Sequence, residues 1–142
     1  SLHDALPIWK NLTLTYKHLE HLIDAFMPRT RRNNTYCKTL SGVSDERIKS
    51  VRTIDGLREV FNNDRYHKVN FEAYSRHRTV EFRQHSGTTN FTKMENWIRF
   101  LNGLITFAKR SSLPSRMTLE ELPFLDGKQK LFFKLRTKKL AV

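Results

Sequence analysis

Two alternating runs of residues, followed at once by a helical pattern, most constrain the fold of this 142-residue chain. In residues 69–74 and again in residues 79–85, apolar and polar side chains alternate, as in a half-buried strand. The short link of residues 75–78 favours an antiparallel hairpin. In residues 92–109 the apolar positions recur with the helical period instead. The sequence therefore predicts an α+β fold in which a small antiparallel hairpin, at about residues 68–85, packs on helices.

The two faces of this hairpin have opposite characters. Its apolar positions are Val69, Phe71, Val80 and Phe82. We expect this apolar face to pack on the helix around Trp97, because that helix follows directly in the chain. Alternation places Glu81, Arg83 and His85 together on the other face. We expect that polar face to be open.

Helices are also predicted on either side of the hairpin. An apolar stripe with helical spacing covers residues 9–27 and ends at Pro28. Ser44 and Thr53 are typical helix caps, each followed by a short amphipathic segment. Thr118 and a glutamate three positions later form the pattern of a capping box, which predicts another short helix.

Positive charge is concentrated in two segments. The chain has 26 Lys and Arg residues against 14 Asp and Glu, a formal net charge of +12. Residues 29–38 and 128–139 contain no acidic residue and supply most of this excess. Such a balance suits a nucleic-acid-binding module, and equally an enzyme whose substrates are ATP and acidic carboxylates. We interpret the basic tail, at about residues 126–142, as a helix on the domain or as a nucleic-acid contact.

Composition excludes several classes of protein and site. The apolar fraction of 38% and the mean hydropathy of −0.61 leave no stretch that could span a bilayer. The single cysteine, Cys37, excludes a disulfide within the chain and suits a reducing cytoplasm. We interpret Cys37 as a semi-buried structural thiol, because no paired base can be placed beside it. We interpret His67, His77 and His85 as polar surface residues, because a zinc site would need tighter convergence and a fourth ligand.

Glu81 and Arg83 are the most informative pair in the chain. A glutamate on a rigid strand can hold a hard cation such as Mg²⁺ through its oxygens. An arginine two positions later can clamp a phosphate or a carboxylate with two hydrogen bonds. On alternation alone, an ion pair on an exposed strand face is the favoured interpretation.

The residues around this pair carry a family resemblance. Thr79-Val80-Glu81-Phe82-Arg83 is followed by Gly87-Thr88 and by the Trp97 helix. Upstream matches are Arg32, Asn34, Tyr36, Cys37, Arg65, Tyr66 and Asn70. Over roughly residues 9–110, the chain resembles the C-terminal half of the amidoligase family. That family belongs to the carboxylate–amine ligase superfamily with the glutamine synthetase-like fold, so the resemblance implies a fragment of such a catalytic domain.

The resemblance also implies roles for individual residues. Glu81 matches the glutamate that binds a catalytic metal in this superfamily, and Arg83 matches the arginine that binds substrate carboxylate or phosphoryl groups. The further candidates for binding substrate or phosphate are Arg32, Asn34, Arg65, Arg76 and Arg78. The implied cofactors are ATP and Mg²⁺, and the implied substrates are a carboxylate and an amine, with peptides as one option. The implied reaction forms an amide through an acyl phosphate.

The chain departs from the family pattern in three ways. Arg78 stands where the family often has glycine, and Thr79 stands where the glutamine synthetase pattern has arginine. The chain also has no Glu-x-Glu strand, which supplies further metal carboxylates upstream in the family. We therefore expect weak or no ligase activity from this chain alone.

Residues 1–8 resemble one reading frame of a sequencing-adapter oligonucleotide, and we expect them to be an artefact. The alternative function is a basic nucleic-acid-binding module without catalysis.

Overall fold

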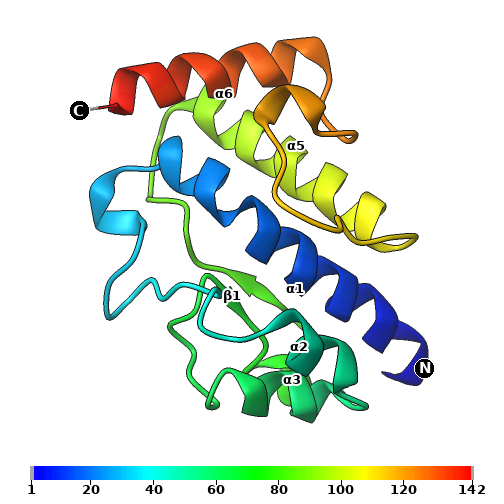
Figure 1. The fold of residues 1–142 in the computed structure, drawn as a ribbon. Coiled ribbons are helices and arrows are strands. Elements are labelled where there is room, and N and C mark those ends of the chain that lie inside the picture. Colours follow the sequence, from blue (N-terminus) through cyan, green and yellow to red (C-terminus); the bar gives the residue numbers. More distant parts are fainter. Residues whose placement is uncertain (1, 142) are drawn as a thin grey trace.

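A long central helix organises the computed structural model, which describes residues 2–141 (Figure 1). Helix α1 (Leu2–Ala25) has α5 (Phe91–Ala108) and α6 (Gly127–Leu140) on one side and a small sheet with shorter helices on the other. The sheet and the helices on that side are α2 (Asp45–Ser50), α3 (Ile54–Val60), β1 (Val69–Asn70), α4 (Tyr74–His77) and β2 (Glu81–Phe82). The short helix η1 (Arg29–Arg31) follows α1, and η2 (Leu119–Glu121) contacts α6. The predicted α+β class is confirmed. No helix in the described part of the chain combines the length and apolar character that crossing a membrane requires.

The hairpin is antiparallel, as predicted, but its strands are much shorter than predicted. Val69 pairs with Phe82, and Asn70 pairs with Glu81. After β1 the Asn70 side-chain oxygen accepts a hydrogen bond from the Glu72 amide at 2.9 Å, which turns the chain away from the ladder. The link expected between the strands is the helix α4, which ends at Arg78 in the left-handed conformation, with a φ of 56°.

The prediction that the apolar face of the hairpin packs on the Trp97 helix is wrong. Phe71 packs edge-on against Trp9, with ring centroids 6.3 Å apart, and Phe82 lies 6.2 Å from Tyr16. Both partners belong to α1. Trp97 and α5 pack on the other side of α1, where Trp97 meets Phe26 at 6.3 Å. Proximity in the chain therefore misled the prediction, because α1 lies between the two elements (Figure 1).

Helix α1 can separate two layers because it is buried on several sides. Its fully or nearly fully buried residues include Leu12, Thr13, Leu14, Thr15, Tyr16, Leu19 and Ile23. A helix that is buried nearly all round belongs in a core rather than on a surface. The helix begins at Leu2, earlier than the predicted start at Trp9. The expected adapter origin of residues 1–8 stays a prediction.

The local capping predictions are partly confirmed. The Ser44 hydroxyl accepts a hydrogen bond from the Arg47 amide at 3.2 Å, and the Thr53 hydroxyl accepts one from Gly56 at 2.9 Å. The capping box predicted at Thr118 is wrong, because that hydroxyl donates to the Glu121 carboxylate and the segment forms the short 3₁₀ helix η2.

The basic tail forms the helix α6, and a capping box starts it. The Asp126 carboxylate accepts from the Gln129 amide at 2.8 Å, and the Asp126 amide donates to the Gln129 side chain at 3.0 Å. Phe133 docks the helix on the core, with its ring centroid 4.3 Å from that of Phe26. The tail is therefore a helix on the domain, one of its two predicted forms.

Asp45 joins α2 to α1 and makes the stability of the fold sensitive to acid. The carboxylate accepts from Lys17 Nζ and from His18 Nε2, each at 2.7 Å. Burial raises the pKa of Asp45, but these hydrogen bonds outweigh it and hold the pKa below its ordinary value of 3.8. A carboxylate with a lowered folded-state pKa stabilises the protein above its unfolded-state pKa, and this contribution is lost as the pH falls through the folded-state pKa.

We therefore expect Asp45→Asn to lower the melting temperature near pH 7. This difference from the unmodified chain should shrink as the pH falls below about 3.8 and vanish once the pH is below the folded-state pKa of Asp45. Thermal melts across this range measure the effect. Glu46→Gln is the control, since Glu46 is an exposed neighbour that makes no ion pair among the described residues. A difference that stays constant down to the acid limit would contradict the assignment.

Candidate functional site

The strand β2 presents Glu81 and Arg83 on one face, as alternation predicts. Phe82 between them packs towards Tyr16 in the core. Arg83 Nη1 donates to Glu81 Oε1 at 2.7 Å. The Glu81 side chain is 51% exposed and that of Arg83 is 23% exposed, so the carboxylate faces solvent while the guanidinium lies against the protein.

Glu81 lies in a shallow open groove with a volume of about 640 Å³. The ionisable lining residues of this groove, which we call the Glu81 groove, are Arg58, Arg65, Glu72, Arg76, His77 and Glu81. Arg65 and Arg76 are two of the residues predicted to bind substrate or phosphate. The groove thus brings carboxylate oxygens and guanidinium groups to the same surface. Arg83 joins this set through its ion pair with Glu81.

Tyr66 holds two of these arginines in place. The Arg83 guanidinium carbon lies 5.2 Å from the centroid of the Tyr66 ring. The corresponding distance for Arg65 is 4.9 Å, and Arg65 Nη2 also donates to the Tyr66 hydroxyl at 2.8 Å. Tyr36 packs edge-on against the same ring at 5.5 Å. Arginines that stack on an aromatic face are oriented without losing their donors, so Tyr66 is a positioning residue.

Two buried polar atoms near Glu81 have no hydrogen-bond partner among the described residues: Arg83 Nε and Glu72 Oε1. The other Glu72 oxygen accepts from Arg58 Nε at 2.6 Å. Buried polar groups in folded proteins are normally paired, so an unpaired donor and an unpaired carboxylate oxygen at one site are groups that a ligand could satisfy. The donor suits an anionic oxygen, and the carboxylate suits a cation. Glu72 was not predicted as a site residue, although the alternation of residues 69–74 places it on the same face as Asn70.

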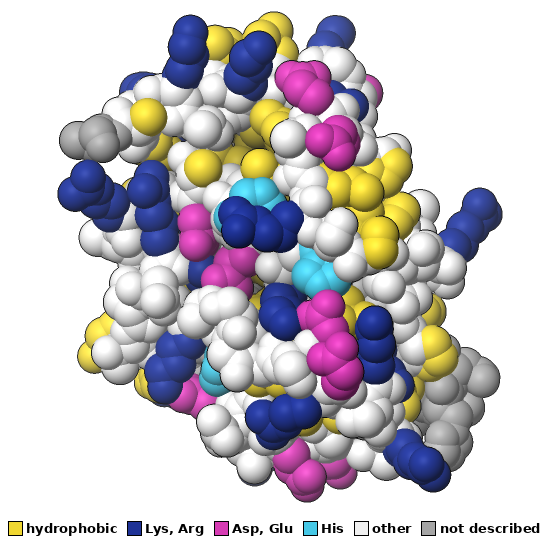
Figure 2. All heavy atoms as spheres, viewed as in Figure 1, with side chains coloured by type: hydrophobic (Ala, Val, Ile, Leu, Met, Phe, Trp, Pro, Cys, Tyr) yellow, Lys and Arg dark blue, Asp and Glu magenta, His cyan; other side chains and the backbone are white. Residues whose placement is uncertain are grey.

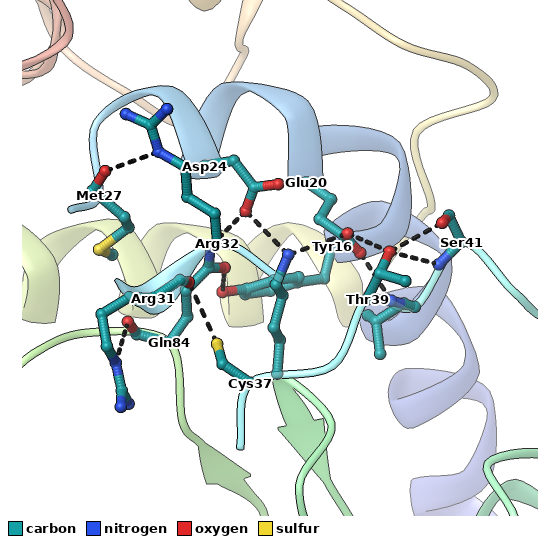
Figure 3. Close-up of polar contacts among 12 residues, drawn as sticks. Tyr16, Glu20, Asp24, Met27, Arg31, Arg32, Cys37, Thr39, Ser41 and Gln84 are labelled. Carbon is teal, nitrogen blue, oxygen red and sulfur yellow. Dashed lines mark hydrogen bonds and ion pairs between the residues drawn. The ribbon is translucent and has the colours of Figure 1, made fainter. Parts of the chain in front are cut away.

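Arg32 and Arg78, both predicted to bind substrate or phosphate, lie outside the groove. Beyond the end of α1, Arg32 Nε donates to the Met27 carbonyl at 3.0 Å (Figure 3). Arg32 Nη2 donates to the Leu140 carbonyl at 3.5 Å. Arg78 lines a separate cavity, and its guanidinium carbon lies 6.0 Å from the Tyr74 ring centroid. Arg32 thus links the segment after α1 to the end of α6. Arg78 has a left-handed backbone, and its side chain lies in the separate cavity instead of the groove.

Asn34 and Arg31 support the site from behind. The Asn34 side-chain oxygen accepts from the Tyr36 amide at 2.9 Å and shapes the turn that presents Tyr36 to Tyr66. Arg31 donates to the carbonyl oxygens of Arg83 and of Gln84, the latter at 3.1 Å. Asn34 therefore acts through Tyr36, and Arg31 fixes the backbone next to Arg83.

A buried polar network fastens the hairpin to α1 (Figure 3). Lys68, which is fully buried, donates to Glu20 Oε2 at 3.0 Å and to Asp24 Oδ1 at 2.8 Å. The Gln84 amide nitrogen donates to Asp24, and the Gln84 oxygen accepts from the Tyr16 hydroxyl at 2.7 Å. Burial raises the pKa of Asp24 and of Tyr16. Since Lys68 precedes β1 and Gln84 follows β2, this network sets the position of the strand that carries Glu81.

Comparison with known proteins assigns the chain to a family. A family model described as "Putative amidoligase enzyme" matches residues 1–105. The chain belongs to this amidoligase family. No curated protein and no solved structure matches it. The matched residues include the whole Glu81 groove, whereas α6 lies outside them.

His85 and Cys37 of this amidoligase-family chain lie away from the Glu81 groove. The prediction that His85 shares a face with Glu81 is wrong. Because β2 ends at Phe82, the His85 ring turns towards α5, with its centroid 5.3 Å from that of Trp97. Within residues 5–141, no three His, Cys, Asp or Glu side chains are grouped so that they could hold a metal ion. Cys37 is fully buried and donates to the Arg31 carbonyl at 3.1 Å, and burial raises the pKa of its thiol. The prediction of a structural thiol is confirmed.

Proposed function

We propose that this chain is the C-terminal part of an ATP-dependent carboxylate–amine ligase with a glutamine synthetase-like fold. The observation that carries the proposal is the Glu81–Arg83 pair at 2.7 Å, beside an unpaired buried Arg83 Nε, in a chain of the amidoligase family. In the proposed reaction a carboxylate attacks the γ-phosphorus of ATP, which gives an acyl phosphate and ADP. An amine then attacks the acyl carbon, and inorganic phosphate leaves as the amide forms.

The residues of the groove fit a magnesium ion. Among the described residues, one Glu81 oxygen accepts from Arg83, the other Glu81 oxygen has no hydrogen-bond partner, and Glu72 Oε1 in the same groove is unpaired. Mg²⁺ prefers carboxylate oxygens and is commonly held by one or two carboxylates, with water and substrate phosphate completing its coordination. Glu81 would be the main protein ligand, with Glu72 as a second. The ion, when bound, would neutralise negative charge on the phosphates.

The arginines of the site would bind the anionic parts of the substrates. Arg83 Nε is buried without a hydrogen-bond partner among the described residues, and Tyr66 keeps the guanidinium in place beside Glu81. Arg65 and Arg76 line the same groove and can bind further oxygens. Guanidinium groups that are already oriented stabilise the charge of a transferring phosphoryl group at little reorganisation cost. Before ligand binds, Glu81 compensates the charge of Arg83.

Trapping the acyl phosphate tests this function. The full-length protein that contains this chain is incubated with ATP, Mg²⁺, a panel of carboxylates and hydroxylamine. If the ligase forms an acyl phosphate, hydroxylamine attacks it and releases phosphate, which gives a hydroxamate. The amount of ADP formed should equal the amount of hydroxamate. The present chain is assayed in parallel, and we expect little or no product from it because the proposal assigns further metal ligands to upstream strands. ADP formation without hydroxamate for every carboxylate, or no turnover by the full-length protein, would contradict the proposal.

The nucleic-acid alternative finds no support in the family comparison. On the face shown in Figure 2, Lys and Arg side chains are interspersed with Asp and Glu instead of forming one continuous basic patch. A duplex contact needs positive charge that follows the phosphate backbone. We therefore keep the ligase as the proposal.

A further inference from the structure

A small cavity lies between the loop after β2 and helix α6. Its volume is about 90 Å³, several times the roughly 10–15 Å³ that one water molecule needs. The polar lining residues of this cavity, which we call the α6 pocket, are His85, Ser86, Thr88, Lys93 and Arg136. The pocket shares no residue with the Glu81 groove. Along an extended chain at about 3.3 Å per residue, His85 is up to roughly 13 Å from Glu81.

Positive charge converges on this pocket without a carboxylate to balance it. No acidic residue lines it, and neither Lys93 nor Arg136 belongs to an ion pair among the described residues. The pKa of His85 is lowered first by burial and then by the charges of Arg136, Lys93 and Arg31, although its hydrogen bond to the Ser86 carbonyl opposes this. These cations come from α6, α5 and η1, so three separate elements bring positive charge to one imidazole.

The walls of the pocket would strengthen the attraction for an anion. Phe26, Phe132 and Phe133 form an apolar side, and charge interactions are stronger beside such low-dielectric surfaces. The Thr88 hydroxyl accepts from the Asn90 amide at 3.1 Å, which leaves its own hydrogen free to donate. His85 Nδ1 lies 2.6 Å from the Ser86 carbonyl oxygen and must donate to it. Protonation of Nε2 would therefore add a further donor.

We propose that the α6 pocket binds a phosphate-sized oxyanion, held by Arg136, Lys93 and the Thr88 hydroxyl. Arg136 and both phenylalanines of α6 lie outside the residues that match the family model, so this chain's C-terminal helix completes the site. Binding is independent of the ligase proposal, because no residue of the Glu81 groove takes part. The oxyanion is either free phosphate or the terminal phosphate of a larger molecule.

Titration of the ¹⁵N-labelled chain at constant ionic strength tests the proposal. Inorganic phosphate, sulfate and ATP are added separately, and the amide signals of Gly87 and Thr88 are followed. We expect saturable shifts with phosphate, and we expect Arg136→Gln to weaken binding at least about 10-fold. The pKa of His85, measured with and without sulfate, should rise when the pocket is filled, because an anion offsets the neighbouring charges.

Lys134→Gln is the matched control, because it removes one charge from the same helix. Two positions along an α-helix are about 200° apart, so Lys134 faces away from Arg136, and it lines a different cavity. We expect it to change affinity less than about twofold, and Glu81→Gln should not change it. If Arg136→Gln melts cooperatively only at a much lower temperature, Lys93→Gln replaces it.

Each outcome decides the proposal. Saturation by phosphate and sulfate with the stated dependence on Arg136 supports an inorganic oxyanion. Tighter binding of ATP with the same dependence supports the terminal phosphate of a nucleotide. Equal weakening by Arg136→Gln and Lys134→Gln would show non-specific attraction to a basic chain and overturn the site. Absence of saturation with all three probes would also overturn it, whatever the outcome of the ligase assay.

Discussion

Replacement of Lys68 by methionine is expected to lower the free energy of unfolding by about 3–5 kcal/mol, the typical cost of removing one partner of a buried ion pair. Lys68 is fully buried, and its ammonium contacts Glu20 at 3.0 Å and Asp24 at 2.8 Å. Methionine fills a similar volume, so the loss comes mainly from two carboxylates that keep their charge without the cation. Urea unfolding of both proteins at pH 7 measures it.

The pH dependence of this variant separates electrostatics from packing. Burial raises the folded-state pKa of Asp24 and Lys68 opposes this, so without the ammonium that pKa should rise further and the penalty should shrink as the pH falls and Asp24 binds a proton. A loss caused by packing alone would not change with pH. Lys38→Met is the control, because Lys38 pairs with Asp64 near the surface and is 39% exposed. There we expect at most about 1 kcal/mol. Equal losses at the two lysines would contradict the role of the buried network.

Features that depend on neighbours in the chain could be predicted from the sequence. The helix caps at Ser44 and Thr53 form because a side-chain hydroxyl reaches an amide three positions later. The helix of residues 91–108 follows from its apolar period. The antiparallel pairing of β1 with β2 follows from two alternating runs joined by a short link. Each of these needs information from only a few residues.

Features that depend on contacts between distant segments could not be predicted. Lys68 meets Glu20 across 48 positions of the chain, and an isolated lysine among polar residues gives no sign of such a partner. The hairpin packs on α1 instead of α5 because α1 has apolar side chains on two sides, which its period alone does not reveal. The strands end early because the Asn70 side chain competes for the amide of Glu72.

In the candidate site too, contacts set by neighbours in the chain could be predicted, and contacts between distant segments could not. Alternation within β2 correctly placed Glu81 beside Arg83, because strand geometry fixes the faces of neighbouring residues. Loop residues have no such period. Arg31 lies behind Arg83, while the adjacent Arg32 lies at the end of α1. The role of Tyr66 could not be predicted, because its contacts with Arg65 and Arg83 depend on how the turn around Tyr66 folds against β2.

The Glu81→Gln variant separates a metal ligand from a surface ion pair. As a ligand, the carboxylate would supply the charge that holds Mg²⁺, and glutamine keeps its shape but not its charge. We expect the turnover of the full-length ligase to fall at least about 100-fold, as when one preorganised stabilising group is removed. Stability should change little, since the Glu81 side chain is 51% exposed. Steady-state kinetics and thermal melting measure the two effects.

Glu95→Gln is the matched control, because Glu95 pairs with Arg99 at 2.9 Å on an exposed helix face outside the groove. If Glu81 is only a surface partner of Arg83, both variants should lose at most about 1 kcal/mol of stability and keep full turnover.

A second measurement needs no catalysis: Mn²⁺ added to the present chain should broaden the signals of Asn70 and Glu72 by paramagnetic relaxation. Asn70 pairs with Glu81 across the sheet, and Glu72 lines the same groove. Loss of this broadening in Glu81→Gln, but not in Glu95→Gln, would place the cation at the groove, whereas unchanged broadening together with unchanged turnover would end the metal-ligand assignment.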